Sequence, residues 1–155
     1  MSRKRGGRKS DRRHALCLVF AVDFHALPDF DIPLEFDYYC QHFAEDSVGV
    51  GVREDDYVLD VVNGICAKLC ELDELIAQSA ESWDISRIAK MDLAIMRLAV
   101  YEILYMENIS HMVAINEAVE IAKEFSAEES SKFVNGILGR IARVYKGAGR
   151  GNSGI

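Results

Sequence analysis

The first chemistry that this sequence offers is anion binding by a group of cations at its start. Residues 1–13 contain seven basic residues and one acid, which gives this segment a net charge of +6. Arginine forms paired hydrogen bonds with phosphate and stacks on bases, and arginine-rich segments become ordered on RNA. The composition therefore favours a nucleic-acid ligand. A solvated tail, a targeting signal or a cloning remnant is the alternative.

Metal binding has weaker support. The four cysteines form no Cys-x-x-Cys pair, and only Cys66 and Cys70 lie one helical turn apart, while the four histidines are scattered. Because zinc sites need several ligands at defined spacing, buried free thiols are predicted instead, with no metal and no cofactor.

Catalysis is not predicted either. The acidic pairs Asp55–Asp56 and Glu128–Glu129 are candidate acid–base groups, but adjacent carboxylates on a helix point to different sides and are usually solvated. No nucleophile has a visible base, and the glycines of residues 147–154 lack the strand and helix that a phosphate loop needs. We therefore expect a protein without catalytic residues.

The rest of the chain has the opposite charge to its start. The whole chain carries −7, so residues 14–155 carry −13. From Gly139 onward, however, every charged residue is basic. This asymmetry predicts a polyanion at the two ends and a basic protein partner for the acidic body.

Helices are the elements that must position these groups. Half of the 155 residues are apolar, only two are proline, and no strand pattern is present, which predicts one all-α domain of about seven helices in two packed sub-bundles. The predicted boundary between the sub-bundles is near residues 79–83. The predicted helices cover residues 10–26, a segment that begins at Pro33, and residues 54–78, 91–107, 111–125 and about 127–146, with a short turn at 85–88.

Local signals fix several of these elements. Ser10 and Ser110 are predicted N-caps, and Ser126 with Glu129 matches a capping box for the last helix. Leu16, Val19 and Phe20 form the apolar stripe of the first helix. Residues 91–107 are apolar nearly all round, which predicts a central helix.

The predicted domain organisation has three parts. Residues 1–9 form a disordered basic arm, residues 10–146 the helical domain and residues 147–155 a flexible tail. The longest near-apolar stretch, residues 93–106, contains charges and is too short to span a bilayer. No cleavage site follows the basic start, so we expect a cytoplasmic protein without a membrane partner.

Three motifs in the second half carry a resemblance to a known family. The segments MDLAIMRLAVYEIL (residues 91–104), VAINEAVEIAKEFS (residues 113–126) and SSKFVNGILG (residues 130–139) are similar, in order and spacing, to motifs of the NusB family. The match of RRHALCLVFAVD (residues 12–23) is weaker, and residues 27–52 match loosely.

The resemblance implies an all-α fold and binding to the boxA element of nascent RNA in ribosomal RNA operons. It also implies a partner, ribosomal protein NusE, and a place in the antitermination complex of RNA polymerase. A homodimer is a further expectation, because an apolar partner surface could support one.

The resemblance also assigns roles to individual residues. It implies phosphate contacts by Arg3, Arg5, Arg8, Arg12 and Arg13. Lys132 and Phe133 would lie on the RNA side, and Asp92 and Glu129 on the partner surface. Phe20 stands where many members have tyrosine; it and Phe133 are candidate platforms for stacked bases, although their helical spacing also suits core residues. Polar groups expected to pair inside the bundle are those of Arg97, Glu102, Asn116 and Glu117.

Three departures from the family pattern leave this mechanism intact: Phe20 lacks a hydroxyl, Ser110 replaces a common proline and Gly139 replaces a common acid. Two alternatives remain open. The chain could be an accessory interaction module without RNA specificity of its own. NusB-like domains also occur fused to RNA methyltransferases, but this chain has no room for the cofactor domain.

Overall fold

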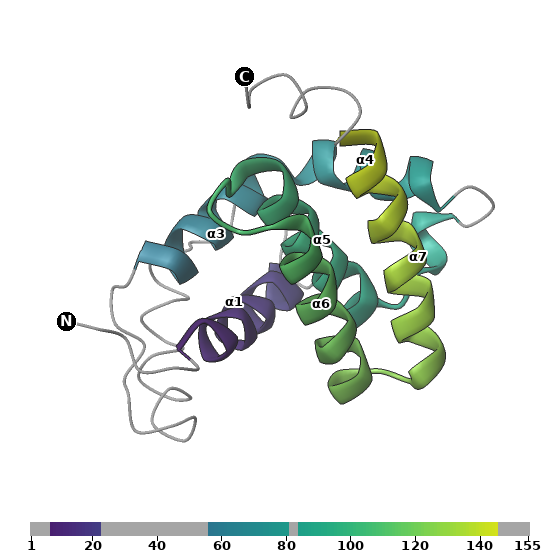
Figure 1. Cartoon of the computed structure of the whole chain (residues 1–155), viewed down its shortest axis with the longest axis horizontal. Coiled ribbons are helices and arrows are strands. Elements are labelled where there is room, and N and C mark those ends of the chain that lie inside the picture. The colour runs from purple at the N-terminus through teal and green to yellow at the C-terminus, as the bar shows by residue number, and fades with distance from the viewer. Residues whose placement is uncertain (1–6, 23–55, 81–83, 146–155) are drawn as a thin grey trace. The chain divides into compact units, whose positions relative to one another are not determined.

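The computed structural model describes residues 7–22, 56–80 and 84–145 (Figure 1). These residues form helices and the turns between them, which confirms the predicted all-α fold. The elements are α1 (Gly7–Val22), α3 (Asp56–Ala67), α4 (Leu69–Ser79), the 3-10 turn η1 (Ile85–Arg87), α5 (Lys90–Tyr105), α6 (His111–Phe125) and α7 (Glu128–Tyr145). The helix predicted to begin at Pro33 and the predicted tail lie outside the described residues.

The chain divides into two compact units, Met1–Ala67 and Lys68–Ile155. The prediction of a boundary near residues 79–83 is wrong, because the division falls between α3 and α4. The predicted helix over 54–78 is broken at Lys68, whose φ of −113° and ψ of 14° lie outside the helical region. The apolar residues keep a helical period across this position, so the sequence pattern does not reveal a break of one residue.

In the first unit, α1 packs against α3. The α1 stripe is confirmed at Leu16 and Val19, which are fully buried, whereas Phe20 is half-buried. From α3, Val58, Val61 and Ile65 are buried. Each such side chain contributes about 1.5–3 kcal/mol when removed from water. Helix α1 begins at Gly7, so Ser10 lies inside it and the prediction of Ser10 as N-cap is wrong.

In the second unit, α5 is the central helix. It contacts α4, α6 and α7, and 11 of its 16 residues are buried. The prediction of a helix that is apolar nearly all round is confirmed. Because water is excluded from most of its surface, the charged residues of α5 need partners within the fold.

Helices α6 and α7 follow one another and pack together. The predicted cap of α6 is confirmed, because the Ser110 hydroxyl accepts a hydrogen bond of 3.1 Å from the Val113 amide. The predicted capping box of α7 is wrong. The helix begins at Glu128, and the Ser126 hydroxyl donates instead to the Asp92 carboxylate.

Candidate nucleic-acid interface

Helix α1 carries the described part of the basic N-terminal segment. The Lys9 side chain is exposed, and the half-buried Arg13 donates from Nη1 to the Lys9 carbonyl over 3.1 Å. Arg12 is only 4% exposed and therefore has little surface to offer a phosphate. Arg3 and Arg5 lie outside the described residues, as does the side chain of Arg8. Of the predicted α1 contacts, the geometry favours Arg13 over Arg12.

His14 follows these cations but adds no positive charge at neutral pH. The side chain is buried in α1, and this burial lowers its pKa, although the negative charge of Asp11 acts in the opposite direction. Desolvation disfavours the charged imidazolium, so the ring is held neutral. Phosphate attraction in this helix must therefore come from lysine and arginine.

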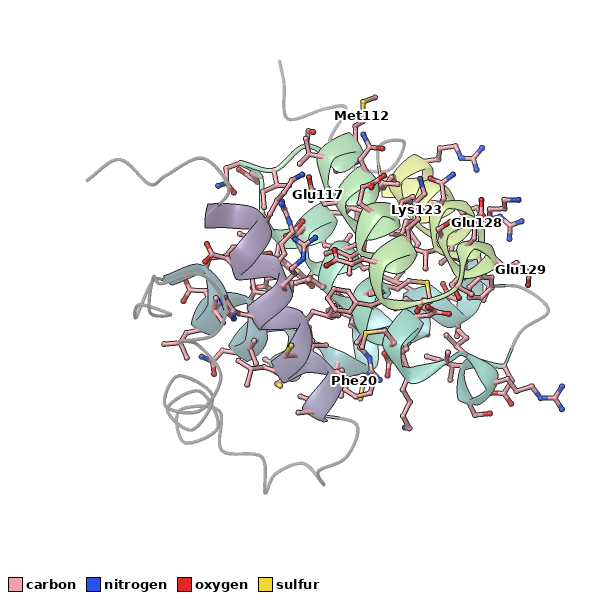
Figure 2. The ribbon with its side chains drawn as sticks, turned by 90° about the horizontal axis from the view of Figure 1, so that it is seen from below. Phe20, Met112, Glu117, Lys123, Glu128 and Glu129 are labelled. Atoms are coloured by element: carbon pink, nitrogen blue, oxygen red, sulfur yellow. The ribbon has the colours of Figure 1, made fainter. Side chains whose placement is uncertain are left out.

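Phe20 lies near the end of α1, where Figure 2 labels it. Its ring is half-buried rather than part of the sealed core. A partly accessible aromatic ring can stack on a base while its remaining surface is anchored in the fold. The predicted stacking role of Phe20 remains a prediction.

The side chains of helix α7 change from acidic in its first turn to basic further along. Glu128 and Glu129 are exposed in its first turn, where the helix dipole favours acids. Lys132 follows on the surface, and the next residue in the sequence, Phe133, is half-buried. Lys132 and Phe133 thus combine an accessible cation with a partly accessible ring, which suits a phosphate and a neighbouring base.

The first turn of α7 continues an acidic surface from α6. Glu120 and Glu124 are exposed on α6, and Figure 2 shows Glu117 and Lys123 along this helix and Glu128 and Glu129 at the start of α7. Lys123 forms an ion pair of 3.5 Å with Glu120, but acids outnumber bases here. This surface complements a basic protein better than a nucleic acid.

Asp92 is not part of that surface. It is 6% exposed, and its Oδ1 accepts a hydrogen bond of 2.8 Å from the Ser126 hydroxyl. The contact joins α5 to the junction between α6 and α7. The prediction that Asp92 faces a partner is therefore not supported, and its geometry is that of a structural residue.

Arg97 is the main buried cation of α5. It donates from Nε to Asp73 Oδ1 over 2.7 Å and from Nη2 to Asp73 Oδ2 over 2.8 Å, and it is itself 4% exposed. The prediction that Arg97 pairs inside the bundle is confirmed, although the sequence did not identify Asp73 as its partner. Glu102 is buried as predicted, whereas Asn116 is exposed and its predicted burial is wrong.

A tyrosine cluster at the other end of α5 was missed by the sequence reasoning. The Tyr105 hydroxyl donates to Glu71 over 2.6 Å, the Lys68 amine lies 5.6 Å from the centre of the Tyr105 ring, and Tyr101 packs at 5.2 Å. The bond to Glu71 and burial raise the pKa of Tyr105 to about 12. Glu71 and Tyr105 are 34 residues apart in the chain. No local pattern joins them.

The cysteines differ from their prediction as buried thiols. Cys17 and Cys70 are exposed and Cys66 is half-buried, and none of the three forms a disulfide. Cys66 and Cys70 belong to different helices because α3 ends at Ala67. Among the described residues, no group of histidine, cysteine or acidic side chains is arranged to hold a metal ion. No described helix combines the length and the apolar character needed to cross a membrane.

Comparison with known proteins gives a consistent result. A sequence model of the NusB family matches residues 9–143. The transcription antitermination protein NusB of Listeria monocytogenes is 36% identical over 135 residues, which cover 87% of this chain and 95% of that protein. The protein of the same name from Acetivibrio thermocellus is 48% identical over 97 residues, which cover 63% and 67% of the two chains.

Solved structures agree with these sequence matches. The structure of T. maritima NusB is 32% identical, covers 92% of this chain and 93% of that one, and superposes with a TM-score of 0.73. The solution structure of NusB from Aquifex aeolicus has a TM-score of 0.72 at 21% identity and covers 92% of each chain. At that identity the second likeness concerns the fold alone.

Proposed function

Because this chain belongs to the NusB family, we propose that it is a cytoplasmic, non-catalytic factor of transcription antitermination that binds boxA-type RNA together with ribosomal protein NusE. The observation that carries this proposal is the similarity to antitermination proteins over 87% of the chain. The physical properties of the described helices support each half of it.

The proposed RNA binding is supported by cations at two separate places in the sequence. Residues 1–13 carry +6, and Lys132 adds an exposed cation next to Phe133 in the sequence. We propose phosphate contacts by Arg3, Arg5, Arg8, Arg13 and Lys132. Base stacking is assigned to Phe20 and Phe133. Arg12 is left out of this set because it is buried.

The protein half is supported by the acidic surface of α6 and α7. Glu129, the predicted partner contact, is exposed there beside Glu128. A ribosomal protein is basic because it must neutralise RNA, so its approach to a chain with −13 outside the N-terminal segment is favoured by long-range attraction. Such a partner would also reduce the repulsion between this acidic body and RNA. Within the antitermination complex, RNA polymerase is then contacted by the assembled heterodimer and its RNA.

The test is fluorescence anisotropy with labelled boxA RNA and a scrambled RNA of equal length, each with and without NusE. We expect tighter binding to boxA than to the scrambled RNA, and a further gain when NusE is present. Binding that is equal for the two RNAs and indifferent to NusE would instead indicate an interaction module without RNA specificity of its own. Failure to bind RNA under any of these conditions would overturn the proposal.

A further inference from the structure

Val144 near the end of α7 is exposed and apolar, but between the acidic first turn and Arg143 the exposed face of this helix forms one polar surface. Its residues are spaced by three and four positions, which places them on the same side of a helix. We call this surface the α7 stripe; its members are Lys132, Asn135, Gly136, Gly139, Arg140 and Arg143. All six are exposed except Gly139, which is half-buried.

Two glycines in the middle of the α7 stripe are not explained by packing against the described part of the chain. A Cβ atom added at Gly136 or Gly139 would meet no atom of the described structure within 4 Å, and neither residue has the positive φ that favours glycine. Glycine inside an exposed helix is less favourable than alanine, because it loses more backbone freedom on folding. The glycines thus leave the helix backbone open to a close approach from outside.

The α7 stripe carries three cations, Lys132, Arg140 and Arg143. No acidic residue occurs between Ser130 and the end of the chain. The described residues contain no ion pair that involves Lys132 or Arg143. Arg143 donates from Nε to the Gly139 carbonyl over 3.3 Å, and Arg140 donates from Nη1 to the Ser79 carbonyl over 2.9 Å. Arg143 is therefore held at the end of the α7 stripe by a neutral carbonyl, and Lys132 lies exposed nearer its start.

We propose that the α7 stripe binds the sugar–phosphate backbone of single-stranded RNA and extends the RNA contact from Lys132 and Phe133 to Arg143. This inference rests on the proposed RNA-binding function and specifies the part of α7 along which the RNA lies. Lys132 and Arg143 are eleven residues apart, a length of about 16 Å along the helix axis. Such a length suits a segment of a few nucleotides, as in other single-strand sites of about 4–16 nucleotides.

The composition of the α7 stripe favours RNA over an acidic protein. None of its six residues is apolar or aromatic. Protein interfaces have an apolar centre, whereas nucleic-acid interfaces are polar and positively charged. The glycines let ribose and phosphate approach the helix, and the flanking cations take up the negative charge.

The experiment compares variants of the full chain by RNA anisotropy over a series of salt concentrations. Arg143→Gln should weaken binding of a boxA-type RNA about threefold to fivefold, which is the scale of one exposed charge contact. The slope of log affinity against log salt should become shallower by about 0.7, the value for one phosphate of a single strand. Lys123→Gln on α6 is the matched control, because it removes one exposed cation outside the α7 stripe and should change neither quantity.

The variant Gly136→Ala distinguishes the loss of an RNA contact from a loss of folding. Because the new Cβ meets no atom of the described chain, the variant should melt about 3 °C higher than the parent. Its RNA affinity should nevertheless fall at least threefold, because the methyl group occupies the path of the RNA backbone. Asn116→Ala, an exposed substitution within α6, should also stabilise its helix but leave RNA affinity unchanged.

Each outcome bears on the inference. If the parent binds RNA and neither Arg143→Gln nor Gly136→Ala weakens it, the α7 stripe is not an RNA contact, while the proposed function stands. If polyglutamate competes with RNA and its binding is equally reduced by both variants, the surface is a general anion site and the inference is overturned. If the parent binds no RNA, the proposed function and the inference both fail.

Discussion

Replacing Asp73 with alanine is expected to destabilise the second unit strongly, although Asp73 lies on a helix surface. The Asp73 carboxylate accepts two hydrogen bonds from Arg97, which is only 4% exposed. Without Asp73 the guanidinium loses its main counter-charge but cannot reach bulk water. Breaking a fully buried ion pair costs about 3–5 kcal/mol.

The expected cost is smaller here because the pair is partly hydrated. The Asp73 side chain is 27% exposed, and Arg97 has a further interaction within the fold. We therefore expect a loss of about 2–3 kcal/mol in the free energy of unfolding. With an m-value of about 2 kcal/mol per molar urea, the unfolding midpoint followed by far-ultraviolet circular dichroism should fall by about 1–1.5 M.

Two further variants make this reasoning refutable. Glu74→Ala removes an exposed carboxylate from the neighbouring position of α4 and should cost less than about 0.5 kcal/mol. The double variant Asp73→Leu, Arg97→Met should recover most of the loss, because it leaves no buried charge unpaired. If Asp73→Ala costs no more than Glu74→Ala, Arg97 does not depend on Asp73 and our account of the α4–α5 contact is wrong.

Three other predictions concern polar groups of the described helices. Tyr105→Phe removes the bond to Glu71 and should cost about 0.5–1 kcal/mol in urea unfolding at pH 7. Because the folded pKa of Tyr105 is raised to about 12, this contribution to stability should persist up to about pH 10 and vanish between pH 10 and 12. A loss of stability in the variant that is unchanged at pH 12 would refute the assignment. His14 has a lowered pKa, so the unfolded chain binds its proton more readily, and stability should fall as pH drops below about 6.5; a His14→Gln variant that retains the same pH dependence in thermal melts would exclude His14 as its source. Ser126→Ala leaves the Asp92 carboxylate short of a donor and should cost about 1–3 kcal/mol without changing NusE affinity by titration calorimetry, whereas a selective loss of NusE affinity would return Asp92 to the partner surface.

Sequence reasoning was strongest where the structure is governed by local patterns. Helix α6 has the predicted bounds, His111–Phe125, because a serine cap and a regular apolar stripe mark it. The central position of α5 followed from its lack of a polar face. Both features depend on residues that are close together in the chain.

It was weaker wherever two distant segments decide the outcome. Ser126 fits a capping box by spacing, but the buried Asp92 competes for its hydroxyl from α5. Asn116 is part of a family motif and was expected inside the bundle, yet it lies on the exposed side of α6. The break at Lys68 is hidden because the apolar period continues past it, and the contacts of Tyr105 with Glu71 and Lys68 join residues more than 30 positions apart.

The central claim is that separated cations of this chain hold the phosphates of single-stranded RNA, and its most direct test is the salt dependence of RNA affinity. The measurement compares the full chain with a chain lacking residues 1–6, both with NusE and boxA RNA; this truncation leaves α1 intact from Gly7. With about five phosphates engaged, log affinity should fall against log salt with a slope of about −3.5 or steeper. Loss of Arg3 and Arg5, together with Lys4, should make the slope shallower by at least about 1.4. A slope near zero for the full chain, or equal slopes for the two chains, would contradict the account.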